Sequence, residues 1–176
     1  MCHSWSHDLK LRDALVVVLA LCMSAFGTTY YADLAASGAN NGSSWTDAWQ
    51  TWSAVNGALS GLSDNDGGHT ILFRSGSWGA IAENAALELE RNDWLTLQAD
   101  EGADPCFASL YLTHPVGRNA WVKFVGINFY SAVGGDSRGF CWKYGNYLWL
   151  EDLSIDFEGY VIEGGQWSPY CRMQTG

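Results

Sequence analysis

Proline, basic residues and histidine are all scarce in this chain of 176 residues. It contains 3 prolines beside 20 glycines, a balance that favours tight turns over a flexible linker composition. The 9 Lys and Arg residues stand against 19 Asp and Glu residues, which gives a formal net charge of −10. Because phosphate binding needs clustered basic side chains, we expect no nucleic acid as a partner. The same charge balance would hold a polyanion only through a bound cation or a local basic patch.

Several common catalytic and metal-binding motifs are also missing. The sequence has no CxxC pair, phosphate loop, nucleophile elbow or HExxH segment, so the zinc, redox and enzyme classes marked by these motifs are not indicated. After residue 27 the histidines are His69 and His114, too few for a histidine-based metal centre. The run from Asp64 to Gly68 is similar to a calcium loop, but Ser75 stands where an EF-hand needs glutamate. We therefore expect a turn there, no metal site and no cofactor.

One long apolar run is present, near the N-terminus. Lys10 and Arg12 precede the apolar residues from Ala14 to Met23, and the segment from Ser24 to Gly27 supplies small residues. This order is typical of a secretory signal peptide that is cut after Gly27. The run is too short to span a bilayer as a mature helix, and an uncleaved anchor or a buried helix is the alternative. We expect residues 1–27 to be a signal peptide and the mature protein to be secreted, extracellular or periplasmic, without membrane association.

Three cysteines remain after the expected signal peptide, namely Cys106, Cys141 and Cys171. An odd number in an oxidising compartment is compatible with one disulfide and one unpaired thiol. It is equally compatible with a partner cysteine outside this sequence. The spacing of the three residues does not decide the pairing.

An internal repeat is the most informative feature of the sequence. Three segments share one pattern: an Asn lies one or two positions before an aromatic residue, and alternating apolar residues follow. The segments are residues 91–97, 118–124 and 145–150. Apolar positions of the second segment recur 26 residues later in the third: Val122, Phe124, Ile127 and Phe129 as Leu148, Leu150, Leu153 and Ile155. A fixed period of this size indicates stacked repeat units. The alternation within each unit predicts two short strands, joined by a corner at Val125-Gly126 or Glu151-Asp152.

Two strands joined by so short a corner cannot form a hairpin that buries the same inward residues. They can form neighbouring strands of a coil, and one coil of a parallel β-helix needs about this many residues. We therefore predict an all-β solenoid in which inward positions stack from coil to coil. A further 26 residues beyond Leu148 lead to Gln174, so the next rung would begin as the chain ends. The chain is expected to stop after roughly three to four rungs, without a terminal cap.

The segment before the repeats predicts a cap. Thr46 or Asp47 can begin a helix with one apolar stripe, formed by Trp49, Trp52, Val55, Leu59 and Leu62. Such a helix would cover the open end of the first coil. The residues from Thr70 to Phe73 are expected to form the first strand. The predicted organisation is a signal peptide at 1–27, a cap with an amphipathic helix at 28–69, and incomplete β-helix rungs at 70–176.

Three segments carry a resemblance to a known superfamily. They are Tyr30-Tyr31-Ala32-Asp33 with the Gly/Asn/Ser loop that follows, Ala48-Trp49-Gln50-Thr51-Trp52, and the run from Gly68 to Gly76. Together they resemble the opening of secreted right-handed parallel β-helix proteins of the pectate-lyase-like superfamily. Gly68-His69 departs from the Gly-Asp usual in that family. The resemblance covers most of the mature chain and implies a right-handed β-helix with a polysaccharide as partner.

By this resemblance, the second strand of each repeat belongs to the sheet that lines the substrate groove. The outward residues there are Asn128, Tyr130, Ser154 and Asp156, and stacking would place Tyr130 beside Asp156. Related lyases hold Ca²⁺ with groove carboxylates and use Lys or Arg as the base, and related hydrolases use clustered aspartates. Asp156 has no second carboxylate in register and is better explained as a solvated surface residue. The catalytic residues are therefore expected in rungs outside this sequence, and any Ca²⁺ would belong to the full-length protein.

Several tryptophans could act as platforms for sugar rings, since a flat aromatic face matches the apolar face of a pyranose. Trp142, Trp149 and Trp167 are the candidates. Trp149 lies between inward apolar residues, so it points outward, where glycan binding and stacking are about equally expected. Trp94 and Trp121 recur at one repeat position, which favours a core or stacking role for both.

Lys123 falls in the same outward column as Thr96 and Trp149. A basic side chain in such a column can act as a catalytic base. A surface lysine whose aliphatic stem covers an aromatic neighbour is the simpler interpretation.

The sequence thus predicts a secreted carbohydrate-active β-helix protein of the polysaccharide lyase or glycoside hydrolase type, present as an N-terminal fragment and monomeric when complete. Its predicted substrate-binding residues are Asn128, Tyr130, Trp149, Ser154 and Asp156. The alternative is a non-catalytic surface or adhesive β-helix that binds glycans or serves as a scaffold. A third interpretation is a capping region without an activity of its own. The first of these rests on fold-level analogy.

Overall fold

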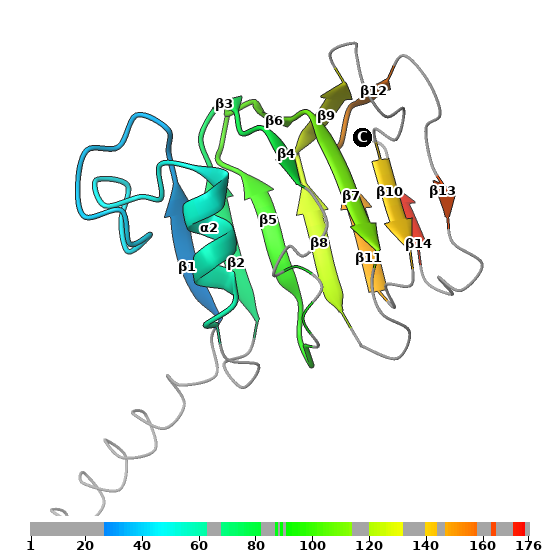
Figure 1. The fold of residues 1–176 in the computed structure, drawn as a ribbon, viewed down its shortest axis with the longest axis horizontal. Helices are drawn as coiled ribbons and strands as arrows, with labels where there is room; N and C mark the ends of the chain where they lie inside the picture. The colour runs from blue at the N-terminus through cyan, green and yellow to red at the C-terminus, as the bar shows by residue number, and fades with distance from the viewer. Residues whose placement is uncertain are drawn as a thin grey trace, which may run out of the picture.

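The structure is a computed structural model, and it describes residues 27–62, 68–81, 87, 89, 91–113, 120–131, 140–143, 147–157, 163–164 and 171–174. These residues form short strands and one short helix (Figure 1). The predicted all-β class is confirmed. The expected signal peptide, Trp167 and His114 lie outside the described residues.

Every strand pairs in parallel with its neighbours, in three sheets that we call A, B and C. Sheet A contains, in order, β1 (Thr28–Ala32), β2 (His69–Phe73), β5 (Leu95–Ala99), β8 (Trp121–Val125), β11 (Tyr147–Glu151) and β14 (Cys171–Gln174). Sheet B contains β3 (Gly76–Ser77), β6 (Pro105–Phe107), β9 (Asn128–Ser131) and β12 (Ile155–Phe157). Sheet C contains β4 (Ala80–Ile81), β7 (Ser109–Thr113), β10 (Phe140–Lys143) and β13 (Glu163–Gly164).

The chain visits the sheets in the same order each time, A then B then C, before it returns to sheet A. We call one such passage a repeat, and strands β2 to β4 form the first described repeat. Val122 pairs with Leu148 across β8 and β11, and Phe129 pairs with Ile155 across β9 and β12. The register predicted from the 26-residue period is therefore confirmed. The prediction of two strands per repeat was incomplete, because each repeat adds a third strand in sheet C.

The core lies between the sheets and is built from stacked inward columns. Side chains alternate between the two faces of a strand, and one inward column of sheet A contains Ile71, Leu97, Phe124 and Leu150. The first three are 0% exposed and the last is 3% exposed. Burial of each such side chain contributes roughly 1.5–3 kcal/mol. The hydrophobic effect thus stabilises one register, because a slip by one residue would turn the column to solvent.

Helix α2 (Trp52–Leu59) covers the N-terminal end of this core (Figure 1). Val55 and Leu59 are buried, and the ring of Trp52 meets that of Phe107 edge-on with centroids 5.4 Å apart. The predicted start at Thr46 or Asp47 was wrong. Thr51 is the N-cap, and its hydroxyl accepts a hydrogen bond from the Ala54 N–H at 3.1 Å.

The loop before α2 has its own function in the cap. Asp47 organises this loop by accepting hydrogen bonds from the Ala39 N–H at 2.7 Å and the Ser44 hydroxyl at 3.1 Å. Trp49 is outside the helix and bridges to Ala32 in β1. The segment from Thr70 to Phe73, predicted to be the first strand, belongs to β2. The strand β1 precedes it in the chain and pairs with it along the full length of β1. The loop therefore covers the outer edge of β1, which would otherwise be unpaired.

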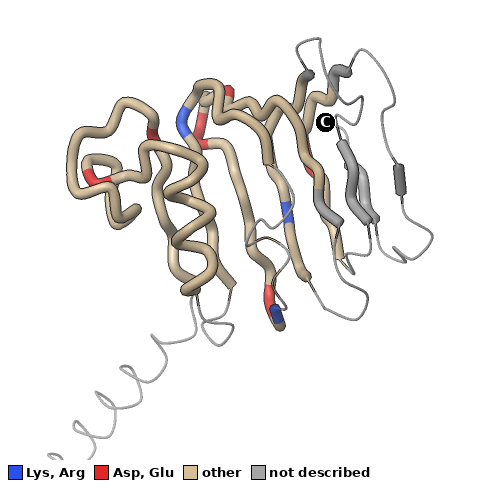
Figure 2. Tube along the Cα trace, viewed as in Figure 1, with Lys and Arg blue, Asp and Glu red and all other residues tan. Residues whose placement is uncertain are grey.

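The corners between sheets A and B occur where the sequence predicts them. Gly126 has φ 64° and Asp152 has φ 53° at equivalent positions of two repeats, and the left-handed region suits glycine and tolerates aspartate. The corner between β5 and β6 is longer and carries Asp100, Glu101 and Asp104. Most described charged residues lie at corners and strand ends (Figure 2). Among the described residues no helix has the length and hydropathy to cross a membrane.

Candidate functional site

The five predicted binding residues do not form one surface. Asn128 and Tyr130 lie in β9 and Asp156 lies in β12, both in sheet B, and Ser154 directly precedes β12. Trp149 lies in β11, on the outward side of sheet A. The structure therefore places the predicted residues on two faces, the outward sides of sheets A and B.

On sheet B, an amide links three successive repeats. The Oδ1 of Asn128 accepts a hydrogen bond from the Ser154 N–H at 3.0 Å, and its Nδ2 donates to Asp104 Oδ1. Both polar ends of Asn128 are thus used within the protein. This arrangement favours a structural role for Asn128 over direct contact with a ligand.

Tyr130 is an exposed residue of this face, with 44% of its surface accessible. It pairs in register with Asp156, as predicted, although the Asp156 side chain lies outside the described part of the chain. A hydrogen bond with the side chain of Cys106 raises the pKa of Tyr130 above its ordinary value of 10.0, with smaller contributions from the electrostatic interaction with that side chain, from desolvation and from Asp104. Tyr130 is therefore a protonated donor at neutral pH and a poor general base.

Cys106 is a residue of this face that the sequence did not point to as a neighbour of Tyr130. Its thiol is free, and the residue is 9% exposed in β6, opposite Asn128 in the register. Cys106 therefore forms no disulfide in the described part of the chain. The side chains of Cys141 and Cys171 lie outside the described part of the chain, so their pairing stays open.

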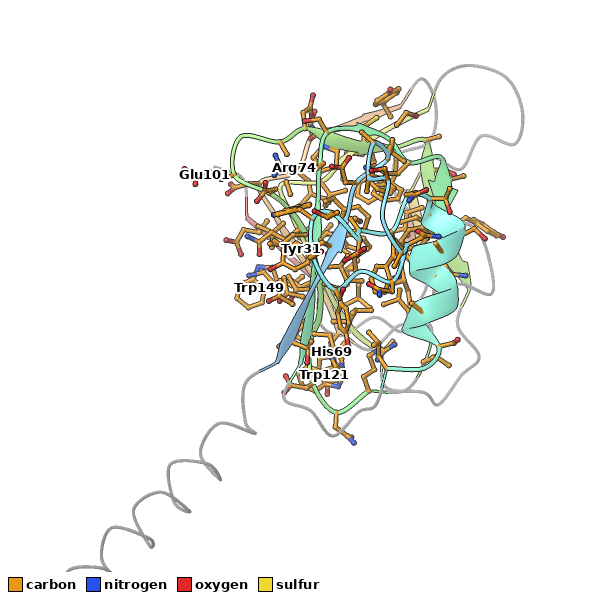
Figure 3. The ribbon with its side chains drawn as sticks, turned by 90° about the vertical axis from the view of Figure 1, so that its left-hand side faces the viewer. Tyr31, His69, Arg74, Glu101, Trp121 and Trp149 are labelled. Carbon is orange, nitrogen blue, oxygen red and sulfur yellow. The ribbon has the colours of Figure 1, made fainter. Side chains whose placement is uncertain are left out.

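On the outward side of sheet A, four rings gather into what we call the aromatic cluster: Trp94, Trp121, Tyr147 and Trp149. Pairing of Leu95 with Val122 places Trp94 beside Trp121, which in turn pairs with Tyr147. All four rings are partly buried. Figure 3 shows Trp149 on the side of sheet A that faces away from α2, with Trp121 toward the lower end of the sheet.

The rings of the aromatic cluster differ in how their faces are used. Trp121 and Tyr147 stack at 3.7 Å between centroids with an interplanar angle of 23°, so each covers a face of the other. Trp94 meets Trp121 at 84° and Trp149 at 88°, with centroids 5.3 and 6.0 Å away. Neither of these neighbours lies parallel to Trp94. Trp94 therefore has no parallel ring partner among the described residues, and we take it as the candidate for stacking on a flat ligand.

Lys123 covers Trp149. Its Nζ lies 4.8 Å from the ring centroid of Trp149 and 2.7 Å from Oε2 of Glu151. Cation–π attraction and the ion pair act on the same ammonium group, and both side chains of the ion pair are less than a third exposed. The interpretation of Lys123 as cover for an aromatic neighbour is confirmed. Because this face of Trp149 is occupied, Trp149 is a weaker platform than the sequence suggested.

A similar arrangement stands near the N-terminal end of sheet A. The guanidinium carbon of Arg74 lies 4.3 Å from the ring centroid of Trp45, and its Nε lies 3.4 Å from Asp100 Oδ2. Trp45 also contacts Tyr31 of β1, with centroids 4.8 Å apart. Sequence reasoning missed this group, because Trp45 lies in a loop without periodicity. Trp94, by contrast, was marked by its recurrence at one repeat position.

The described residues contain no group of three or more His, Cys, Asp and Glu side chains arranged to hold a metal ion. The side chain of Trp142 lies outside the description. Comparison of the chain with protein-family models, with curated proteins and with solved structures found no match. The geometry of the two faces is therefore the basis for any functional assignment.

Proposed function

We propose that this chain is part of a secreted right-handed parallel β-helix protein that binds polysaccharide. The repeated passage through three parallel sheets, with inward columns in register, supports the solenoid. The signal-like N-terminal segment supports export. The hand of the helix and the superfamily rest on the resemblance of residues 30–33, 48–52 and 68–76 alone.

The aromatic cluster is the single observation that carries the binding function. Its four rings lie on the outward side of sheet A and are only partly buried, and apolar groups gathered on a surface often mark an interaction site. A pyranose ring offers an apolar face of C–H groups, and Trp94 offers a flat indole that neither Trp121 nor Trp149 meets in parallel. A sugar ring that stacks on Trp94 would bury apolar surface and gain dispersion contacts.

Removal of the Trp94 ring tests this proposal. The full chain should be retarded in native gels that contain a polysaccharide, and Trp94→Ala should abolish most of that retardation. Leu34→Ala is the control, because it removes an exposed apolar side chain that is not a member of the aromatic cluster. Absence of retardation by every polysaccharide in a broad panel, for a chain that melts cooperatively, would reject the proposal.

A catalytic function is the second candidate, and one observation favours it. Tyr130 stands beside Asp156 in the register of sheet B, which places a phenol next to a carboxylate residue in one sheet. Tyr130 as proton donor beside a carboxylate would suit a lyase or a hydrolase. Release of reducing ends, or of an unsaturated product, should then be lost in Asp156→Asn. Binding without any such product supports the non-catalytic form of the proposal.

A further inference from the structure

The described basic side chains are all engaged within the protein. Arg74 contacts Asp100 and Trp45, and Lys123 contacts Glu151 and Trp149. Arg91 is 3% exposed, and its Nη2 donates a hydrogen bond to the Leu59 carbonyl oxygen at 3.1 Å. An acidic ligand would have to displace a carboxylate from Arg74 or Lys123 before it could use either positive charge.

The described carboxylates outnumber these basic groups, and one of them adjoins the aromatic cluster. The described side chains include eight carboxylates and three basic groups. Asp93 is partly buried and directly precedes Trp94, and its Oδ1 accepts a hydrogen bond from the backbone N–H of Trp94 at 2.8 Å. A carboxylate has about four lone-pair sites, so Asp93 can accept further hydrogen bonds from sugar hydroxyls. The same charge repels the carboxylate of a uronic acid.

From these contacts we infer that the ligand of the aromatic cluster is a neutral polysaccharide and not an acidic one. The inference rests on the proposed carbohydrate binding and names its substrate class. Trp94 supplies the stacking surface, Asp93 accepts hydroxyl hydrogen bonds, and the pairing of Lys123 with Glu151 removes the charge that would attract a polyanion. Arg172 stands next to Trp149 in the register of β14, and its side chain lies outside the description.

The test compares neutral and acidic polymers in native gels. The full chain is run through gels that contain a soluble β-glucan, xylan or mannan, and through gels that contain polygalacturonate or alginate, at low and high sodium chloride. We expect retardation by a neutral polymer, little change with salt, and loss of retardation in Trp94→Ala. Preferential retardation by the acidic polymers, weakened by salt, would overturn the inference while leaving carbohydrate binding intact. Absence of retardation by all polymers would reject carbohydrate binding itself.

A pair of variants tests the charge argument directly. Glu151→Gln releases Lys123, so retardation by polygalacturonate at low salt should rise about two- to fivefold, the range that one such pair supports. Glu101→Gln removes the same charge from an exposed corner residue and leaves the Lys123–Glu151 pair in place, so it should change little. An equal gain in both variants, or no gain in Glu151→Gln, would contradict a role for the pair. Wild-type binding to polygalacturonate that is lost in Arg172→Gln would overturn the inference.

Discussion

The outward sides of sheets A and B are organised by different interactions, although the same repeats form both. On sheet A, side chains contact one another through rings and charges, as in the stack of Trp121 on Tyr147. On sheet B, side chains form hydrogen bonds with backbone groups and with corner residues. Asn128, for example, accepts from the Ser154 N–H and donates to the Asp104 carboxylate. The strands differ accordingly: β5, β8 and β11 have 5 residues each, whereas β6 and β12 have 3.

Strand length accounts for this difference. A longer strand places several outward positions beside those of its neighbours, about 4.8 Å away, so large side chains meet across repeats. A short strand leaves few outward positions, and polar side chains at its ends bond to nearby backbone groups. A binding surface therefore develops more readily on sheet A, and a rigid corner develops on sheet B. Four predictions test this comparison.

The largest effect is expected for Trp121→Ala. This change removes a half-buried ring that stacks on Tyr147 and contacts Trp94, and it should lower the free energy of unfolding by about 2 to 3 kcal/mol. Tyr130→Ala on sheet B should cost less than about 1 kcal/mol, since that ring is already exposed. Urea unfolding of the two variants measures both values. Equal losses would mean that sheet A carries no special packing on its outward side.

A smaller effect is expected for Asn128→Ala. The variant leaves the Ser154 N–H and Asp104 without their present partner, so the free energy of unfolding should fall by about 1 to 2 kcal/mol. Asn128→Asp keeps the acceptor for Ser154 and places a second charge beside Asp104, so its cost should shrink at low pH. Urea unfolding at neutral and acidic pH checks this. A neutral Asn128→Ala variant would show that the amide does not hold the repeats together.

The pair of Lys123 and Glu151 should contribute less still. A double-mutant cycle with Lys123→Met and Glu151→Gln should give a coupling energy of about 0.2 to 1 kcal/mol, which decreases as salt is added. Chemical denaturation of the four proteins at two salt concentrations provides the cycle. A coupling energy that does not respond to salt would assign the contact to packing of the lysine stem on Trp149 instead.

The last prediction concerns ionisation of Tyr130. The raised pKa means that the folded protein favours the protonated phenol, so any stabilisation is present below the ordinary pKa and is lost as pH rises through the higher folded value. Ultraviolet titration of the wild type minus Tyr130→Phe should show one tyrosine that ionises above pH about 10. Cys106→Ala should lower that midpoint, because the thiol is the largest cause of the shift. An unchanged midpoint would remove Cys106 from the explanation.

Much of the repeat was predictable from the sequence, and much of the site was not. The pairing of Val122 with Leu148 followed from a period of 26 residues, because identical spacing repeats the same local structure. The short strands of sheet C were missed, since strands such as β4 and β13, with 2 residues each, carry no periodicity. Trp149 was favoured over Trp94 as a platform because its direction was predictable, whereas the cover by Lys123 was not.

By itself, the sequence determined which residues of sheets A and B point inward and where the chain turns between them. Alternation along a strand and glycine or aspartate at a corner are local properties, and they act wherever the repeat recurs. The tertiary structure decided which outward residues meet. Trp94 directly precedes β5 and Trp149 lies in β11, and these strands are not neighbours in sheet A, yet the two ring centroids lie 6.0 Å apart. Such contacts depend on side-chain direction across stacked strands, and no local pattern in the chain encodes them.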